Sequence, residues 1–495
     1  MHSLANSVVE CVYLNAGSTP DKLAVVAEGV EVTYAKLWKN VLSFCDYLSR
    51  DEVAPGSNVL IQASHSAEYV TAYLGASLRG CSAVPYEENM PVDAVLDLAC
   101  RVGGSCIVSN QDFGSTDAKV IRPQYEDDIC VDVEALCPSE FPGSDDVAEL
   151  LFTTGTTGKS KTVVLTHRAI MSVEQNIITA TGILSDNVSL VPMPLNHVFA
   201  LRRLQVALAI GATAVLVNGV ASLKKLFSSI TTYHITSLSL VPSALAYIEK
   251  TTRNYLEKFA GQIRFVESSS APLPSATRDW LRSVLPQSKL YNSYGCTEST
   301  ACCMLEYSKR TDDASCVGTP CCTADIKILD LSTGTDTTGE GRIAIGGSGV
   351  MSGYLNDEEA TARTLVNGYV LTNDLGCFKD GELHVLGRID DVVLIGGNNV
   401  SPGEVEDALL KADFIEDCAC VGAHHAVAGD HLVMFVVGPS LQKDASEAAL
   451  KVREYLKGIV EPYKIPDDIR VIDEVPRTYN GKIDRKQLRA LANED

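Results

Sequence analysis

Two kinds of hydrophobic pattern alternate along residues 1–389. Apolar side chains recur at helical spacing over Ala35–Leu48 and Tyr69–Leu78, which predicts helices with one buried face. Short β-branched runs separate such stretches and predict buried strands; they are Asn58–Gln62, Val147–Phe152, Thr162–Leu165, Ala214–Val217, Ser237–Val241, Ile263–Glu267, Ile326–Leu329 and Arg342–Ile345. Helices that alternate with short strands indicate α/β layers around a mostly parallel sheet.

The pattern changes at two places. Glycine becomes dense and helical spacing disappears over Gly334–Gly353, which indicates a small antiparallel or β-barrel-like unit. Asp390 and Asp391 then separate two strand-like runs, Glu382–Leu386 and Val392–Ile395. The C-terminal segment beyond them is long enough for one small α+β domain. The predicted fold is α/β, with a large N-terminal domain of layered β/α subdomains and a barrel-like unit (residues 1–389), followed by a small α+β C-terminal domain (residues 390–495).

Composition narrows the classes of function. The chain has 495 residues, of which 46% are hydrophobic and 21% charged, as in a globular protein with several subdomains. Its formal net charge of -22 disfavours nucleic acid or an anionic membrane as a partner, so an anionic ligand needs a local cluster of donors. No apolar run reaches the roughly 18–20 residues of a membrane span. The N-terminus lacks a basic segment followed by an apolar one, so we expect no signal peptide.

The 16 cysteines favour a reducing compartment with free thiols, and hence a cytoplasmic location. Six of them fall between Cys296 and Cys322, but no C-x-x-C pair occurs there. We therefore expect buried structural thiols in this segment rather than a metal site.

The segment Phe152–Lys161, FTTGTTGKSK, is the strongest candidate for ligand binding. Glycine leaves backbone N–H groups accessible to an anion, threonine adds hydroxyl donors, and Lys159 and Lys161 add positive charge. The spacing of Gly155 and Gly158 differs from G-x-x-x-x-G-K-[ST], which excludes the ordinary P-loop. From composition alone, a flexible surface loop remains an alternative.

Three further segments carry suitable chemistry. Tyr291–Thr300, YNSYGCTEST, combines an aromatic ring, a hydroxyl and the carboxylate of Glu298, a ligand type that Mg²⁺ prefers. Asp374 follows a strand-like run and can accept hydrogen bonds from ribose hydroxyls. Arg388 and Lys482 lie in glycine-containing turns, GRID and NGKID. Taken singly, each of these residues is an ordinary surface group.

Together and in this order, the segments resemble the adenylate-forming superfamily of acyl-CoA synthetases, aryl-acid ligases, luciferases and peptide-synthetase adenylation domains. The resemblance extends from about residue 20 to the C-terminus. It rests on FTTGTTGKSK, SSSAPL (Ser268–Leu273), YGCTE (Tyr294–Glu298), GEGRIAIGGSGVMSGYLN (Gly339–Asn356), TND (Thr372–Asp374), GRIDDVVLIGGNNVSPGEVE (Gly387–Glu406) and PRTYNGKIDRKQL (Pro476–Leu488).

The resemblance implies a role for each matching residue. The triphosphate of ATP is held by Thr153, Thr154, Gly155, Thr156, Thr157 and Gly158, with Lys161 adding charge. Ser270 and Ala271 line the adenine site, and Tyr294 lies against the base. Thr297 contacts the region of the α-phosphate, Glu298 binds Mg²⁺, and Asp374 and Arg388 hold the ribose.

The resemblance also implies movement. Asp390 is the hinge of a mobile C-terminal domain, and Lys482 is the catalytic lysine that this domain carries. Gly396, Gly397 and the segment Val400–Pro402 belong to a loop that faces the thiol tunnel in CoA ligases after rotation. The chain departs from the family at Ser160 and Thr162, where proline and glycine are usual, and at Asn373, where the family has glycine.

The sequence gives partial information about the carboxylic acid that is the substrate. In amino-acid-activating relatives, an aspartate pairs with the ammonium group of the substrate. The matching position here is Val198. An unpaired ammonium group in an apolar site is costly, so an α-amino acid is disfavoured as the substrate. His197 matches a gating or orienting residue near the carboxylate, although a histidine at a helix start is the plain alternative. The pocket candidates are Val198, Phe199, Leu240, Val241 and Ser293, whose mixed character fits a fatty or an aryl acid.

The leading hypothesis is an ATP- and Mg²⁺-dependent acid–thiol ligase that forms acyl-CoA, with ATP, Mg²⁺ and CoA as its cofactors and a small carboxylic acid as its substrate. A stand-alone adenylation enzyme that loads the phosphopantetheine of an acyl or peptidyl carrier protein is the alternative, because PRTYNGKIDRKQL is also typical of adenylation domains. A non-catalytic nucleotide- or acyl-binding relative is a third interpretation. Retention of Lys161, Glu298, Asp374, Arg388 and Lys482 argues against it.

Overall fold

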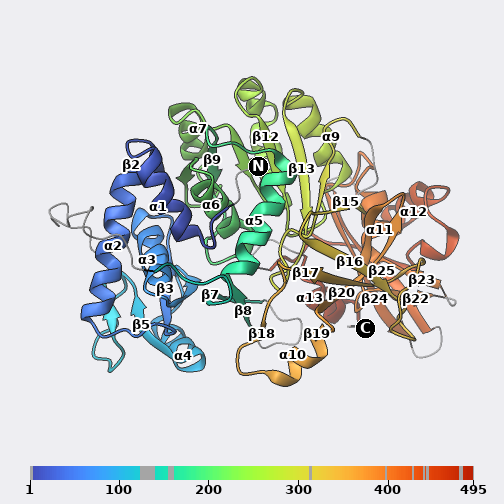
Figure 1. Cartoon of the computed structure of the whole chain (residues 1–495). Helices are drawn as coiled ribbons and strands as arrows, with labels where there is room; N and C mark the ends of the chain where they lie inside the picture. Colours follow the sequence, from blue (N-terminus) through green and yellow to red (C-terminus); the bar gives the residue numbers. More distant parts are fainter. Residues whose placement is uncertain are drawn as a thin grey trace.

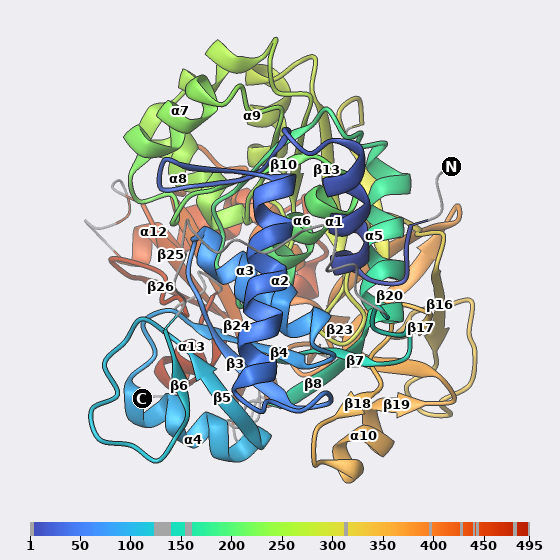
Figure 2. The same ribbon diagram turned by 60° about the vertical axis from the view of Figure 1, so that its left-hand side comes forward.

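The protein is built on two large sheets with helices packed against them, and two smaller sheets lie toward the C-terminus (Figure 1). This computed structural model describes residues 4–122, 140–153, 161–310, 315–395, 398–425, 429–438, 441, 445–478 and 483–493. Figure 2 shows α4 and β5 together at one end of the molecule, while α7, α8 and α9 lie at the opposite end.

One sheet has seven strands in the order β18-β8-β7-β4-β3-β5-β6. Its parallel strands are β3 (Asn58–Ala63), β4 (Ser82–Glu87), β5 (Gly104–Val108), β6 (Val120–Ile121) and β7 (Val147–Phe152). The strands β8 (Thr162–Thr166) and β18 (Gly353–Tyr354) extend it in antiparallel fashion. The helices of this region are α1 (Val8–Ser18), α2 (Tyr34–Arg50), α3 (Ala67–Leu78) and α4 (Val92–Val102).

The other sheet has fourteen strands, and its first half is parallel. In spatial order this half contains β13 (Lys289–Tyr294), β12 (Phe265–Ser268), β11 (Ser237–Ser239), β9 (Val188–Val191), β10 (Thr213–Leu216) and β1 (Leu23–Ala27), with β2 (Val30–Thr33) antiparallel at the edge. Its helices are α5 (His167–Thr181), α6 (Val198–Ala209), α7 (Leu223–Thr232), α8 (Pro242–Thr252), the 3₁₀ turn η1 (Tyr255–Phe259) and α9 (Ser275–Val284).

The second half of this sheet is antiparallel. It contains β14 (Cys303–Glu306), β15 (Cys316–Pro320), β16 (Ala324–Leu329), β17 (Gly341–Gly347), β19 (Leu365–Val366), β20 (Tyr369–Lys379) and β21 (Glu382–Arg388), with α10 (Glu358–Thr364) beside it. The sequence predicted a separate barrel-like unit near Gly334–Gly353. The antiparallel character is confirmed, and the ladder from β13 through β14 to β15 joins these strands to the parallel half.

The C-terminal part has a core of its own. Its elements are β22 (Val393–Ile395), β23 (Asn398–Val400), α11 (Pro402–Leu409), β24 (Asp417–His425), β25 (Gly429–Val437), α12 (Ala445–Leu456), η2 (Pro462–Lys464), β26 (Asp468–Val471) and α13 (Arg485–Ala492). One buried cluster joins α11, α12 and one side of the three-stranded sheet, and another packs α13 on the other side. The predicted mixed α/β composition of this segment is confirmed.

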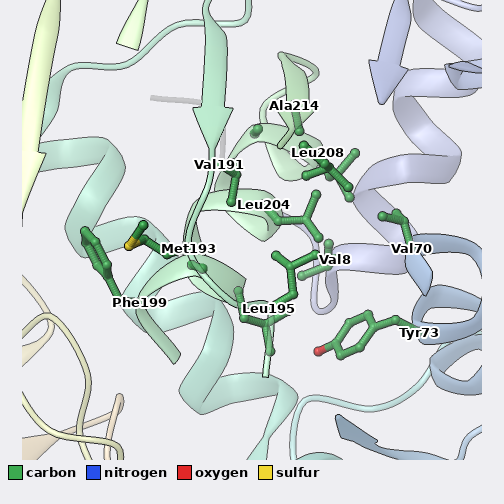
Figure 3. Packing of buried hydrophobic residues seen from close by; sticks show 14 of the residues in the cluster. Val8, Val70, Tyr73, Val191, Met193, Leu195, Phe199, Leu204, Leu208 and Ala214 are labelled. Carbon is green, nitrogen blue, oxygen red and sulfur yellow. The ribbon is translucent and has the colours of Figure 1, made fainter. Parts of the chain in front are cut away.

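The large core packs around α6 (Figure 3). Leu204 and Leu208 point toward Val8 of α1 and Val70 of α3, whereas Phe199, at the start of α6, points to the other side. Residues four apart on a helix share a face, so the side of α6 that carries Phe199 also carries Arg203. This second face lies toward the predicted acid site.

Glu174 on α5 is fully buried, and in the described part of the chain neither of its carboxylate oxygens has a hydrogen-bond partner. Burial raises the pKa of Glu174 from 4.5 to about 8, while Arg202 lowers it and Glu149 raises it further. The unfolded chain therefore releases this proton at lower pH than the folded protein does. Stability must fall as the pH rises from about 4.5 to about 8.

We expect Glu174→Gln to remove this pH dependence, because the amide stays neutral. The free energy of unfolding of the wild type, relative to that of the variant, should fall by about 3 kcal/mol between pH 5 and pH 8. Urea unfolding at several pH values measures this difference. The exposed Glu257→Gln is the matched control and should leave the pH profile of the wild type unchanged. A pH-independent difference between Glu174→Gln and the wild type would contradict the prediction.

Candidate active site

One group of side chains gathers around Glu298, just beyond the end of β13. The hydroxyl of Tyr354 donates to Oε1 of Glu298 at 2.7 Å, and the amide N of Met351 donates to the Glu298 carbonyl at 2.8 Å. The ammonium of Lys161 lies 4.7 Å from the centre of the Tyr354 ring. The antiparallel pairing of β8 with β18 sets this contact, since Tyr354 is registered with Val163. A lysine and an acidic residue from distant motifs are thereby brought to one place.

A second group forms at the end of β13, beside the middle of β20 and the end of β21. The hydroxyl of Tyr294 donates to Oδ2 of Asp374 at 2.6 Å, and Nε of Arg388 lies 3.3 Å from Oδ1 of the same carboxylate. Asp374 and Arg388 are register partners on β20 and β21. Burial raises the pKa of Tyr294 well above its ordinary value, and the neighbouring Asp374 adds to this, so the phenol remains a donor. Arg388 is 46% exposed at its side chain, so its guanidinium remains accessible to a ligand.

The predicted adenine segment lies just after β12. Ser270 has a positive φ of 77°, and the Ser269 hydroxyl donates to the Ser293 carbonyl at 2.8 Å. The turn at Ser270 is unusual for a residue other than glycine and stores local strain at this position. Ser270 is exposed and Ala271 half-buried.

The start of α6 carries the residues predicted to meet the acid. His197 is the N-cap residue of the helix, half-buried and extended in conformation. The alternative interpretation, that His197 is simply a histidine at the start of a helix, therefore also agrees with the structure. Val198 is half-buried, whereas Phe199, Leu240 and Ser293 are buried.

The predicted hinge lies directly after β21. The Asn373 side-chain amide donates to Oδ2 of Asp390, and a guanidinium N of Arg489 donates to the Asp390 carbonyl at 3.3 Å. Arg489 also pairs with Asp391. Asn373 is the residue that replaces glycine of the family pattern, so this departure creates a contact with the predicted hinge residue.

Several predicted residues lie outside the described part of the chain. They are Thr154, Gly155, Thr156, Thr157 and Gly158 of the phosphate loop, Gly396 and Gly397, and the lysine Lys482. The loop is bracketed by described residues, because the amide N of Thr153 donates to the Lys161 carbonyl at 3.0 Å. Thr297, which is half-buried, lies next to Glu298 in the chain.

Sequence reasoning missed two buried ion pairs on α6. Arg202 pairs with Glu149 of β7, and Arg203 pairs with Glu267 of β12. Burial raises the pKa of Glu267, and Arg203 counteracts that shift. The signal was present in the sequence, because two consecutive arginines interrupt a largely apolar helix. Buried charges of this kind require partners.

The cysteines between Cys296 and Cys322 differ in exposure. Cys302, Cys303, Cys316 and Cys321 are buried, Cys296 is half-buried, and Cys322 is exposed. Over the residues that the structure describes, no group of three or more His, Cys, Asp or Glu side chains is arranged to hold a metal ion. Likewise, none of the described helices has the length and apolar character to cross a membrane.

The fold and the site define an adenylate-forming enzyme, as the motifs predicted, and comparisons with known proteins agree. The chain belongs to the AMP-binding enzyme family: residues 13–355 match the AMP-binding enzyme model, and residues 404–482 match the AMP-binding enzyme C-terminal domain. Curated relatives include 4-coumarate–CoA ligase 2 of Nicotiana tabacum, 30% identical over 491 residues, which cover 92% of this chain and 89% of the relative. A 2-succinylbenzoate–CoA ligase of Bacillus cereus is 26% identical, with all of both chains covered.

Solved structures show the same architecture. The o-succinylbenzoate CoA synthetase MenE of Bacillus subtilis, in complex with ATP and magnesium, has a TM-score of 0.79 and 26% identity, with 97% of this chain and 98% of that chain covered. The anthranilate CoA ligase AuaEII, in complex with anthranoyl-AMP, has a TM-score of 0.87, 20% identity, and 99% and 98% coverage of the two chains. The predictions of the superfamily and of an AMP-forming acid–thiol ligase are confirmed.

Proposed function

We propose that the protein activates an aryl or fatty acid with ATP to an acyl-adenylate, releases pyrophosphate, and transfers the acyl group to the thiol of CoA. The observation that carries the proposal is the meeting of Asp374 with both Tyr294 and Arg388 beside the Glu298–Tyr354 pair. These residues come from separate motifs, and together they supply the kinds of group that contacts to a ribose, a base and a metal ion require.

The first half-reaction needs charge stabilisation more than proton transfer. The acid is already ionised at neutral pH, and its oxygen attacks the α-phosphorus of ATP while pyrophosphate leaves. The Glu298 carboxylate fits Mg²⁺, since it supplies a hard oxygen and Tyr354 holds it in place through Oε1. Bound there, Mg²⁺ would offset the charge that develops on the phosphate oxygens. The phosphate loop, Thr297 and Lys482 supply donors to the same oxygens.

The Tyr294–Asp374–Arg388 group would hold the nucleoside. Asp374 Oδ1 and Oδ2 both have acceptor capacity left for ribose hydroxyls, and the exposed part of Arg388 can reach them. Ser270 and Ala271 would lie against the adenine ring from the other side of β13. Fixing the nucleoside in this way converts the attack on the α-phosphorus into a well-oriented step.

The second half-reaction requires the thiol to reach the adenylate carbonyl, where Lys482 would obstruct it. We infer a division of the chain into residues 1–389 and 390–495, with the small domain rotating about Asp390 and with the segment Val400–Pro402 then facing the thiol. The separate buried core of the C-terminal elements supports this division.

The acid is of the aryl or fatty class. Val198 offers no carboxylate to an ammonium group, and Phe199 and Leu240 are apolar. The relatives named for coumarate and for succinylbenzoate support an aryl acid in particular. His197, at the start of α6, would orient the carboxylate. The free thiols of the described cysteines fit a cytoplasmic enzyme.

The test is pyrophosphate release with Mg-ATP over a panel of carboxylic acids, each with and without CoA. The panel runs from acetate to long-chain fatty acids and includes benzoates, cinnamates and amino acids. We expect CoA-stimulated release with one class of aryl or fatty acid. Slow release that is indifferent to CoA would favour a carrier-protein thiol instead. ATP binding without release from any acid would favour the non-catalytic interpretation.

A further inference from the structure

The Arg203–Glu267 pair is buried at the predicted acid site. Arg203 is 6% exposed and Glu267 is fully buried. Arg203 lies on α6 and Glu267 on β12, so the pair bridges a helix and a strand that both border the site. Two opposite charges at this depth need a reason, because an apolar pair of similar volume would be equally stable or more so.

Two of the predicted pocket residues contact the side chains of this pair, and a third contacts the backbone of Glu267. The guanidinium carbon of Arg203 lies 5.7 Å from the centre of the Phe199 ring. The Ser293 hydroxyl donates to Oε1 of Glu267 at 2.7 Å. The amide N of Leu240 donates to the Glu267 carbonyl at 3.0 Å. The ion pair is therefore packed among the residues predicted to line the acid site.

The pair retains unused hydrogen-bonding capacity. Oε1 of Glu267 accepts from both Arg203 and Ser293, while Oε2 of Glu267 and Nε of Arg203 have no partner among the described residues. Buried polar atoms without partners are rare in folded proteins, and at a binding site they indicate the place of a missing ligand group. One atom is an acceptor and the other is a donor.

In the neighbouring pair, Nε of Arg202 also lacks a partner among the described residues, but the carboxylate differs. Glu149 uses both oxygens: Oε1 accepts from Arg202, and Oε2 accepts from the Tyr73 hydroxyl at 2.8 Å. Arg202 also donates to the side chain of Gln205. The arginines of the two pairs are consecutive residues of α6. Of the two carboxylates, only that of Glu267 has an oxygen without a hydrogen-bond partner among the described residues.

We propose that the Arg203–Glu267 pair binds an uncharged hydroxyl group at the far end of the substrate acid. The hydroxyl donates to Oε2 of Glu267 and accepts from the Nε–H of Arg203, which satisfies both atoms at once. The pair is neutral overall, so a second carboxylate or an ammonium group meets one attracting and one repelling charge and gains little, whereas a hydroxyl matches both free atoms. The substrate is thus a hydroxylated monocarboxylic acid, a refinement that rests on the proposed acid–CoA ligase activity.

The position on the helix sets the size of the acid. Arg203 comes six residues after His197, which places it about 9 Å farther along the axis of α6. The Arg203 side chain leans back toward Phe199, so if His197 meets the carboxylate, the hydroxyl lies at most about that far from it. A ring with a short unsaturated side chain spans this length, and the face of Phe199 favours an aromatic ring.

The test compares matched acids that differ only in the hydroxyl. We would measure kcat/KM for pyrophosphate release with 4-hydroxycinnamate and cinnamate, 4-hydroxybenzoate and benzoate, and a terminally hydroxylated and a plain fatty acid of equal length. We expect a preference of tenfold or more for the hydroxylated member of the best pair. In the double variant Arg203→Met/Glu267→Leu this preference should disappear or reverse, because the pair is replaced by apolar side chains of similar volume.

The control is Arg202→Met/Glu149→Leu, which changes the adjacent pair in the same way and should keep the wild-type preference. Thermal unfolding of both double variants shows that each has folded. Equal use of hydroxylated and plain acids by the wild type would overturn the inference and leave the proposed function standing. A preference that survives in Arg203→Met/Glu267→Leu would also overturn it. Absence of pyrophosphate release with every acid would instead reject the proposed function, and the inference with it.

Discussion

Replacing Lys482 with alanine is expected to slow acyl-adenylate formation by about 10²–10³-fold. The reason is that, in the proposed mechanism, the lysine ammonium stabilises charge that develops only in the first transition state. Transfer to CoA from a supplied acyl-adenylate should stay within a few fold of the wild-type rate, because the lysine has no part in that step after rotation. ATP–pyrophosphate exchange measures the first half-reaction, and thioester formation from synthetic acyl-adenylate measures the second.

Lys486→Ala is the matched control, since Lys486 is exposed on α13 only four residues farther along the chain. It should leave both half-reactions unchanged. Equal loss of both half-reactions in Lys482→Ala would refute the separation of roles, and with it the argument for rotation about Asp390.

The largest loss of stability is expected from Arg202→Met, about 3–5 kcal/mol in the free energy of unfolding. This change leaves the fully buried Glu149 charge without its cation, and it also removes the donor to Gln205. Arg264→Met is the comparison, because the Arg264–Asp186 pair is more than half exposed on both sides and should contribute at most about 1 kcal/mol. Denaturant unfolding of the two variants measures the difference.

The double variant Arg202→Met/Glu149→Leu should recover much of the stability that Arg202→Met loses, because no unpaired charge then remains. If Arg202→Met and Arg264→Met proved equally mild, the Arg202–Glu149 pair would not be the buried ionic contact that its geometry indicates.

The predicted elements with strong periodicity agree closely with the structure. The helix expected at Ala35–Leu48 is α2, Tyr34–Arg50, and the strand expected at Val147–Phe152 is β7 with the same bounds. A helix of this kind buries one face, and a strand of this kind is buried on both faces. Local geometry therefore dictates the pattern of apolar residues in each. The motifs likewise predicted the family, because each consists of residue types that a nucleotide requires at fixed spacing.

Other features depend on contacts between distant segments and leave no local pattern. Tyr354 was part of a motif without a role of its own, yet its hydroxyl holds Glu298. Glu267 lies in a short strand, and no local pattern marks it as one member of a buried ion pair. Its partner, Arg203, is 64 residues away in the sequence. The continuation of the parallel sheet into antiparallel strands was also not predicted, since strand order is set by tertiary packing.

The continuous ladder from β13 through β14, β15 and β21 to β20 limits how the length of this chain can change during evolution. Tyr294 and Asp374 lie at its two ends, and their hydrogen bond requires both side chains to face the same side. Inserting or deleting one residue within an intervening strand would turn the subsequent side chains to the opposite face. Changes of length are therefore more easily tolerated in the connections outside the ladder, such as the exposed turn at residues 331–340, or at the existing irregularities near Cys316 and Leu375.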